Sequence, residues 1–377
     1  MDALVTDAHI PSSVTGLRAL GRAGLSVAAL APGRSAAGLW SRYTRARALG
    51  PDSVADPDGF RTAVAKLAER HGPLVVYPGQ DEAINALIGG PGTLSEHVEL
   101  PYPGPGPLAA LRDKSRLAEL ASGAGLASPR TIVTGAAAEL AEAADLPDGA
   151  VVKPVHPGGA FPTVMVAVSR EALRALVAGA PPDEQLMLQE RVTGRLMALA
   201  VVVGRDGALV RRFQQVALRT WPEAAGISRL AVSVEPDEHL AEASRSLLAA
   251  AGYWGIAQLQ FLDGPDGPRL IDVNTRFYGS LALALAAGVD LPSAWHAVTR
   301  GLPAGQPQAY RVGVTYRWLE ADVMAAMRGA PRALFARVPR PRTGPMWARD
   351  DPVASAMFAA GSVGGALARR LRPQRRR

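Results

Sequence analysis

The sequence contains no cysteine. Disulfide bonds, thiolate nucleophiles and zinc or iron–sulfur centres with cysteine ligands are therefore excluded. The turn after the first expected strand, residues 7–13, also lacks the G-x-G-x-x-G pattern of dinucleotide-binding folds. These absences direct the search for a functional site away from thiol and dinucleotide chemistry.

The first residues of the chain carry neither the basic nor the apolar segment of a secretory signal. No uninterrupted apolar run reaches the length of a membrane-spanning helix. The chain has 377 residues, of which 48% are hydrophobic, enough for two or three domains with their own cores. We therefore expect a soluble, globular, cytoplasmic protein.

Lysine is scarce in this chain. Only Lys66, Lys114 and Lys153 occur, so 38 of the 41 basic residues are arginine. An ammonium is a compact point charge and a guanidinium is a planar fork, so the two serve different purposes. Each remaining lysine is therefore a candidate functional residue.

The formal net charge of +7 is unevenly distributed. Six arginines lie in residues 369–377, and the rest of the chain is close to neutral. A basic tail of this kind is typical of a solvated chain end, so we expect no nucleic-acid partner. Residues 353–371 are predicted to form a helix packed on the body, and contact of this basic end with anionic lipid is the weaker alternative.

Residues 255–280 predict a β-hairpin that leads into a buried segment. Residues 257–261 and 270–274 alternate polar and apolar side chains, as half-buried strands do. Residues 263–268 between them are rich in turn formers, including Asp-Gly. Two antiparallel strands joined by a turn follow from this pattern.

The polar face of this hairpin carries oxygen-bearing side chains. Gln258 and Gln260 share one face of the first strand, and Asp272 and Asn274 share one face of the second. A hairpin that pairs these faces is suited to a hard cation such as Mg²⁺. Arg276 follows, where its guanidinium can meet an anion bidentately.

A solvent-facing hairpin is the alternative interpretation. The polar face, however, consists of amides and a single acid, not the lysine and glutamate of an ordinary wet face. Residues 281–289 are also too apolar for a surface segment. The pattern therefore favours the floor of a site.

Asp272-Val-Asn274-Thr-Arg276 resembles the metal-binding end of the ATP-grasp superfamily, usually Glu-x-Asn-x-Arg. Gln260 lies 12 residues before Asp272, where the family places its other metal ligand. That ligand is usually Glu, and Gln occurs in members similar to carbamoyl-phosphate synthetase. The resemblance covers residues 105–305 well. It implies that Gln260, Asp272 and Asn274 hold Mg²⁺ and that Arg276 stabilises an acyl phosphate.

Two of the three lysines fit the same resemblance. Lys114, in an expected helix over residues 111–121, lies where the family places a lysine that reaches the nucleotide phosphates. Lys153 ends an expected strand and precedes Gly158 and Gly159, in the position of the second nucleotide lysine and the flexible flap. Backbone N–H groups and an ammonium can both face phosphate oxygens. A surface lysine is the alternative for Lys114.

The next motif resembles the hinge of the family, whose backbone pairs with adenine. The residues expected to hold the nucleotide there are Gln189, Glu190, Arg191 and Val192. The family usually has an acid for the ribose where this chain has Leu196. Glu190 is the expected substitute for that acid.

Two further sites are open in their interpretation. Residues 220–229 resemble a loop that closes over the acceptor in predicted ATP-dependent carboxylate ligases. Arg219 beside this loop has two interpretations: it binds a phosphate or carboxylate of the substrate, or it is a surface arginine. Asp81 and Glu82 follow an expected strand, where open α/β sheets bind ligands. A helix N-cap explains the same pair equally well.

The expected fold class is α/β (α+β), with a Rossmann-like domain before the ATP-grasp fold. The expected units are the N-terminal domain at residues 1–105, the ATP-grasp lid subdomain at 106–190, the metal and acceptor subdomain at 191–305, and a C-terminal extension at 306–377.

The resemblance implies an ATP- and Mg²⁺-dependent ligase that joins a small-molecule carboxylate to an amine through an acyl phosphate, releasing ADP and phosphate. A nucleophile other than an amine is the nearest alternative. A degenerate ATP-binding module, acting as a sensor or scaffold, is the alternative from another class, because Leu196 and Gln260 replace usual acids. Homodimer formation stays open.

Overall fold

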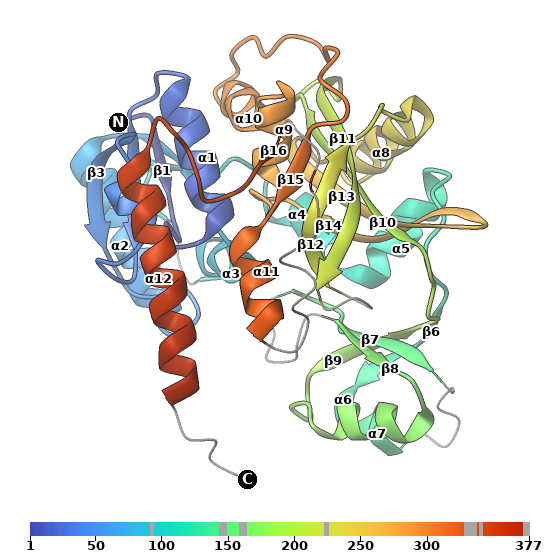
Figure 1. Cartoon of the computed structure of the whole chain (residues 1–377). Coiled ribbons are helices and arrows are strands. Elements are labelled where there is room, and N and C mark those ends of the chain that lie inside the picture. The colour runs from blue at the N-terminus through green and yellow to red at the C-terminus, as the bar shows by residue number, and fades with distance from the viewer. Residues whose placement is uncertain are drawn as a thin grey trace.

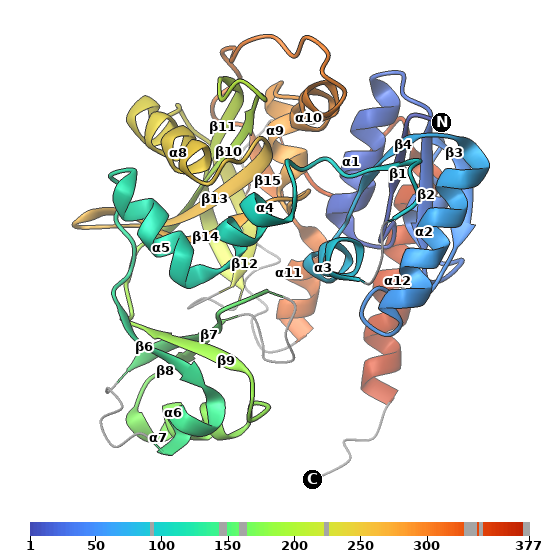
Figure 2. The ribbon, with the colours of Figure 1, turned by 180° about the vertical axis from the view of Figure 1, so that it is seen from behind.

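The computed structural model describes residues 1–90, 94–142, 149–157, 164–221, 226–327, 338 and 342–371. The strands in these residues form sheets of five, seven and four strands. The five- and seven-stranded sheets lie side by side, and the four-stranded sheet forms a separate lobe below the latter (Figure 1, Figure 2). We refer to them as the N-terminal unit, the central unit and the lid.

The N-terminal unit is a parallel sheet covered by helices. It contains β1 (Ala3–Val5), α1 (Pro11–Arg22), β2 (Val27–Ala31), the 3-10 helix η1 (Ala37–Trp40), β3 (Thr44–Leu49), α2 (Pro57–His71), β4 (Leu74–Tyr77), α3 (Asp81–Gly89) and β5 (Val98–Glu99). The strand order is β3-β2-β1-β4-β5. Val5 packs in a cluster with Leu17 of α1, and Leu4 packs in another with Phe60 of α2. Burial on both faces explains the unbroken apolar sequence of the inner strands.

The lid is a small antiparallel sheet with its own core. It contains β6 (Thr131–Ala136), α6 (Ala137–Glu142), β7 (Ala150–Pro154), β8 (Met165–Ala167), α7 (Arg170–Ala178) and β9 (Gln185–Gln189), in the sheet order β6-β9-β7-β8. Val152, Leu173 and Leu188 belong to a cluster separate from the main core. The two lid helices lie on one side of this sheet (Figure 1).

The central unit is built on the seven-stranded sheet, in the order β14-β13-β10-β11-β12-β15-β16. Its strands are β10 (Arg195–Val203), β11 (Leu209–Trp221), β12 (Ile227–Ser233), β13 (Gly255–Gly264), β14 (Gly267–Asn274), β15 (Thr315–Arg317) and β16 (Arg342–Thr343). Its helices are α4 (Pro105–Arg112), α5 (Lys114–Gly123), α8 (Glu238–Ala250), α9 (Leu281–Ala287), α10 (Leu291–Thr299) and α11 (Leu319–Met327). The main core extends from Leu17 of the N-terminal unit to Phe213 and Phe261 of this sheet.

An aromatic cluster joins the N-terminal and central units. The ring of Tyr77, at the end of β4, stacks on Phe277 with 5.5 Å between centroids and meets Trp295 edge-on at 4.9 Å. The Tyr77 hydroxyl lies 2.9 Å from His296 Nδ1. Gly255 has a φ of +114°, and a Cβ there would lie 2.8 Å from Trp295 Nε1. Rigid rings and close packing therefore fix how these units meet.

The expected mixed α/β class is confirmed, and two local expectations are wrong. The helix expected over residues 111–121 is two helices, because Asp113 caps a new helix with its carboxylate. The strand expected over residues 310–319 is only β15, since Gly313 adopts a φ of +80° and ends the extended run. The expected boundaries at residues 105, 190 and 305 stay predictions.

The hairpin expected within residues 255–280 is confirmed, but its turn is shorter than expected. Strand pairing continues to Gly264 and Gly267, so the loop consists of Pro265 and Asp266. Gly267 has a φ of +91°, a conformation that glycine adopts without steric cost.

The C-terminal helix, α12 (Pro352–Leu371), returns to the N-terminal unit. The segment before it is fixed by Asp351, whose carboxylate accepts hydrogen bonds from Arg18 Nε at 2.8 Å, Ser41 Oγ at 2.7 Å and the Arg42 N–H at 2.9 Å. Within the described residues no single helix is long and apolar enough to span a membrane; α9 and α10 pass the length and composition test only as a pair bent by 99°.

Asp351→Ala is expected to lower the free energy of unfolding by about 3–5 kcal/mol, because it leaves the buried Arg18 guanidinium without its carboxylate. The matched control is Asp350→Ala, whose pair with Arg22 is 39–40% exposed and is expected to contribute about 1 kcal/mol or less. Urea unfolding measures both. Equal losses of unfolding free energy in the two variants would show that the buried Asp351 contacts stabilise the protein no more than the exposed Asp350 pair does.

Candidate functional site

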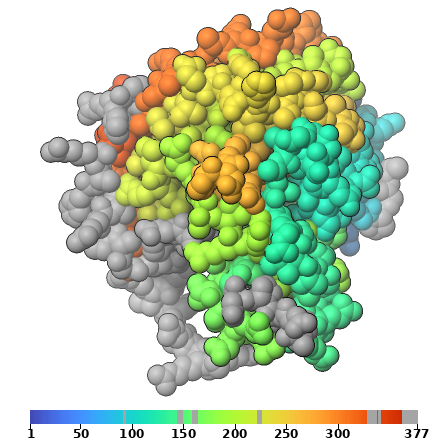
Figure 3. Space-filling view, turned by 90° about the vertical axis from the view of Figure 1, so that its right-hand side faces the viewer, coloured from blue at the N-terminus to red at the C-terminus, as the bar shows by residue number. Residues whose placement is uncertain are grey.

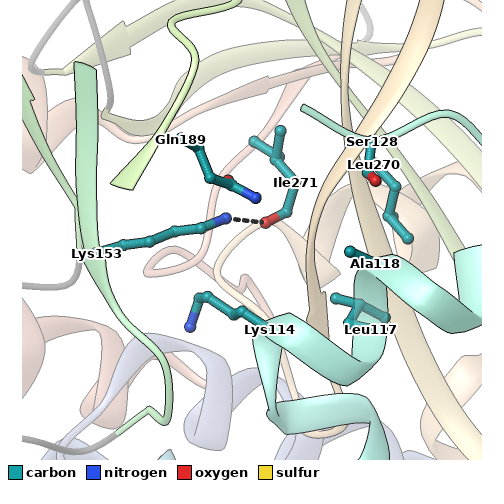
Figure 4. Close-up of a pocket in the computed structure, with 8 residues that line it drawn as sticks. All are labelled: Lys114, Leu117, Ala118, Ser128, Lys153, Gln189, Leu270 and Ile271. Atoms are coloured by element: carbon teal, nitrogen blue, oxygen red, sulfur yellow. Dashed lines mark hydrogen bonds between the residues drawn. The ribbon is translucent and has the colours of Figure 1, made fainter. Parts of the chain in front are cut away.

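A pocket opens where the lid meets the central unit. It is lined by Lys114, Leu117, Ala118, Ser128, Lys153, Gln189, Leu270 and Ile271 (Figure 4). The space-filling view shows α5 beside the tip of the β13–β14 hairpin, above the green surface of the lid (Figure 3). The pocket therefore draws on α5, the lid strands and β14.

Lys153 is held in the pocket by a bulge in β14. Gln260 pairs with Asp272 and Phe261 pairs with Leu270, so Ile271 has no residue opposite it. A bulged residue is released from the regular ladder. The Ile271 carbonyl accepts a hydrogen bond from Lys153 Nζ at 3.1 Å, and this bond ties the lid strand β7 to the residue next to Asp272.

Lys114 lies across the same pocket. It is the first residue of α5, and its backbone N–H donates to the Val155 carbonyl at 3.1 Å, two residues beyond Lys153. Both ammonium-bearing side chains are buried, whereas Lys66 is exposed on α2. Two of the three lysines in the chain therefore face one pocket, as their scarcity suggested.

The charge of Lys153 is costly where it lies. Burial lowers the pKa of Lys153 to about 8; Asp272 opposes this shift and Lys114 adds to it. An anion between the two lysines would offset the desolvation of both ammonium groups. The pocket is therefore electrostatically suited to a polyanion.

The hinge residues lie at the rim of the pocket. Gln189 ends β9, is buried, and donates from Nε2 to Thr131 Oγ1 at 3.3 Å. Glu190 Oε1 accepts from Arg269 at 2.7 Å and from the Arg130 N–H at 3.0 Å, so its carboxylate is already engaged by two partners. Arg191 is exposed and Val192 is half-buried, and their contact with a nucleotide stays a prediction.

The four oxygen-bearing side chains of the hairpin come together as expected. Gln258 pairs with Asn274 and Gln260 pairs with Asp272. Residues directly opposite in an antiparallel pair lie on the same face. The sequence pattern alone therefore located this polar face.

The same side chains offer a hard cation amide oxygens and one carboxylate. Asn274 Nδ2 and Gln260 Nε2 donate to Gln258 Oε1 at 3.3 Å and 3.4 Å, which turns their own amide oxygens away from Gln258. Those oxygens and the Asp272 carboxylate suit Mg²⁺ that obtains further oxygens from a phosphate. Among the described residues no three His, Cys, Asp or Glu side chains form a metal-binding group, so amides and one acid must suffice.

Arg276 binds an acid of the N-terminal unit. Its Nε and Nη2 donate to Asp81 Oδ2 at 2.9 Å and 2.7 Å. Arg112 Nη2 donates to the Asp81 carbonyl at 3.1 Å. Burial raises the pKa of Asp81, but the positive charges of Arg276, Arg112 and Lys114 together outweigh burial and hold that pKa below its usual value. Asp81 is not an N-cap, since Gln80 occupies that position.

Arg219 lies apart from these groups, beside a buried acid. Its Nη2 is 3.8 Å from Asp322 Oδ2, and Arg229 and Arg317 bind the same carboxylate at 3.0 Å and 2.8 Å. Asp322 is fully buried. Arg219 is therefore not an ordinary surface arginine, and its contact with a substrate stays a prediction.

Some expected site residues fall outside the described part of the chain, and some observed ones were not expected. Gly158, Gly159 and residues 222–225 of the acceptor loop lie outside the described residues. Arg112 was not among the expected site residues, and Asp81 was considered only as a ligand site or a cap. The position of Asp81 after a parallel strand was the one available signal.

Comparisons with known proteins relate part of the chain to one family. A family model described as "ATP-grasp in the biosynthetic pathway with Ter operon" matches residues 183–322. A D-alanine–D-alanine ligase from Alcanivorax borkumensis is 32% identical over 126 residues, which cover 33% of this chain and 37% of that protein. The chain thus matches little more than a third of this curated relative.

Two solved structures share the fold. Biotin carboxylase from Campylobacter jejuni superposes with a TM-score of 0.63 at 15% identity, covering 83% of this chain and 74% of the other. The L-amino acid ligase from Bacillus licheniformis superposes with a TM-score of 0.57 at 15% identity, covering 80% and 74%. Residues 183–322 of this chain therefore resemble the ATP-grasp family, and the chain shares the fold of these solved structures. The resemblance to ATP-grasp ligases seen in its sequence is confirmed.

The low pKa of Lys153 is directly testable, because selective ¹³Cε labelling of lysine gives one NMR signal for each of three lysines. The signal lost in Lys153→Arg is expected to titrate with a pKa of about 8 in the wild type. The unfolded pKa is about 10.4, so between these values the unfolded chain binds more protons, and the free energy of unfolding is expected to rise with pH from about 8 to 10.4 as the cost of burying the Lys153 charge is lost. A midpoint above 10 would contradict the burial of this ammonium.

Proposed function

We propose that this protein is an ATP-dependent ligase that joins a small-molecule carboxylate to an amine and releases ADP and phosphate. The observation that carries the proposal is the meeting of two buried lysines with the oxygen-bearing face of the β13–β14 hairpin. The lysines suit the phosphates of a nucleotide, and the hairpin face suits a cation bound to those phosphates.

The nucleotide would lie in the pocket between the lid and the central unit. Lys114 and Lys153 would hold its phosphates, and the backbone of residues 189–192 would meet the adenine. Glu190 is the nearest acid for the ribose, although Arg269 and Arg130 engage it. Leu196, on β10, cannot bind a ribose hydroxyl, so we expect the ribose to be held through Glu190 or through backbone groups.

Gln260, Asp272 and Asn274 would hold Mg²⁺, which would neutralise phosphate charge during transfer. The γ-phosphoryl group passes from ATP to the substrate carboxylate, and an amine then attacks the acyl phosphate and expels phosphate. Such transfers require positioning and charge neutralisation more than a protein nucleophile. Arg276 would bind the acyl phosphate, and Arg219 the acceptor's anionic group.

The similar proteins support this class of reaction. The curated relative is named a D-alanine–D-alanine ligase, and one structural neighbour is named an L-amino acid ligase. The biotin carboxylase neighbour was solved as a β-γ-ATP complex. Amino acids are therefore the first substrates to test for this chain.

A module that binds ATP without turnover is the second candidate. The observation that favours it is the single acid, Asp272, on the cation-binding face, since Mg²⁺ affinity falls with fewer carboxylates. ADP release separates the two candidates, because both bind ATP and only the ligase consumes it.

Lys153→Ala is expected to weaken ATP binding by about 10- to 100-fold, the equivalent of one or two charge-assisted hydrogen bonds. Lys66→Ala, on the exposed face of α2, is the control and is expected to bind ATP normally. Calorimetry measures binding, and ADP release with pooled amino acids measures turnover. A wild type that binds no ATP would refute the nucleotide site, and one that binds without release would favour the module.

Asp272→Asn is expected to raise the Mg²⁺ concentration for half-maximal ADP release by at least about tenfold, because it removes the one carboxylate of the metal face. Saturating Mg²⁺ is expected to restore most of the rate. Asp266→Asn, in the loop of the same hairpin with an 80% exposed side chain, is the matched control. An unchanged Mg²⁺ requirement in Asp272→Asn would place the metal elsewhere.

A further inference from the structure

We propose that Asp81, a residue of the N-terminal unit, is a positioning residue for Arg276. It would hold the Arg276 guanidinium in the orientation that receives the negative charge of the acyl phosphate. The inference rests on the proposed function. It makes the N-terminal unit contribute to the chemical step through Arg276.

The geometry of the ion pair fixes the plane of the guanidinium. Two nitrogens on one edge of Arg276 share a single carboxylate oxygen of Asp81, at 2.9 Å and 2.7 Å. A third, Nη1, donates to the Phe277 carbonyl at 3.3 Å. Among the described residues these bonds engage three of the five N–H groups of a guanidinium and restrain both ends of the group.

Asp81 is itself held firmly. It is the first residue of α3, and Arg112 binds its carbonyl at 3.1 Å and approaches its carboxylate at 3.5 Å. The side chains of Arg276, Asp81 and Arg112 are only 22%, 18% and 7% exposed. The carboxylate therefore separates two cations that would repel each other if it were removed.

The residue after Arg276 is anchored to the same turn. Phe277 stacks on Tyr77, the last residue of β4, and Asp81 follows four residues later in the chain. Two consecutive residues of the segment after β14 thus dock on one strand-to-helix turn of the N-terminal unit. This double contact orients the chain that leaves the metal face, where Asp272 and Asn274 lie.

An unrestrained arginine side chain samples many rotamers, and this freedom would otherwise be lost at the transition state. Asp81 removes this cost in advance. Arg276 follows Asn274 of the cation-binding face by two residues in the chain. Fixing Arg276 there aims a cation at the place where phosphate charge develops.

The test compares Asp81→Asn with Glu69→Gln, which removes a charge of the same sign from an exposed position on α2 of the same unit. In Asp81→Asn, kcat for ADP release is expected to fall about 30- to 100-fold, while the calorimetric Kd for ATP changes by less than about threefold. Glu69→Gln is expected to keep the wild-type kcat. Thermal unfolding checks that each variant is folded.

Chemical rescue separates positioning from a merely structural role. In Asp81→Ala, added formate is expected to restore at least about threefold in kcat by supplying a carboxylate to Arg276, with no effect on the wild type.

Each remaining outcome overturns a defined claim. A wild type without ADP release overturns the proposed function and this inference together. Wild-type turnover with an unchanged kcat in Asp81→Asn overturns only the inference. In Asp81→Asn, a lower KM for the carboxylate substrate with undiminished kcat shows that Asp81 competes with the substrate for Arg276. Loss of ATP binding together with the loss of kcat shows a structural role. Either result overturns the positioning role.

Discussion

The register between β13 and β14 is the constraint on which the candidate site depends. It places Gln258 opposite Asn274 and Gln260 opposite Asp272, and a slip of one residue would send the acid to the other face. The bulge at Ile271 lets Leu270 pair with Phe261 in the core and releases the carbonyl that holds Lys153. The bulge at Ile271 in the β13–β14 pairing therefore both places the metal-binding side chains on one face and connects that face to the lid.

Much of this arrangement was readable from the sequence, because its signals are local. Alternation over a few residues predicted the hairpin, and scarcity singled out the two pocket lysines. The partner of Arg276 was not readable, since Asp81 lies 195 residues earlier in the chain. Neither was the edge strand β3, whose sequence alternates arginine with alanine. Contacts set by tertiary packing leave no periodic signal, and a single sequence carries no record of them.

Charge is distributed unevenly around the site. Lys114, Lys153, Arg112 and Arg276 gather where the three units meet, and the acids that influence them are chiefly Asp81 and Asp272. A surplus of buried positive charge costs stability in the empty protein and is offset when an anion binds. The lid contributes one of these cations, Lys153, from a sheet that has its own core.

The return of the C-terminal segment has a consequence for synthesis of the chain. The N-terminal unit leaves the ribosome before the central unit, yet its Arg18 side chain, nearly fully buried in the folded protein, pairs with Asp351, which lies 333 residues further along the chain. Domains generally fold in the order in which they are made. Here the Arg18 cation of the N-terminal unit stays unmatched until a segment beyond the central unit has been made, so the final packing of the N-terminal unit follows the synthesis of both.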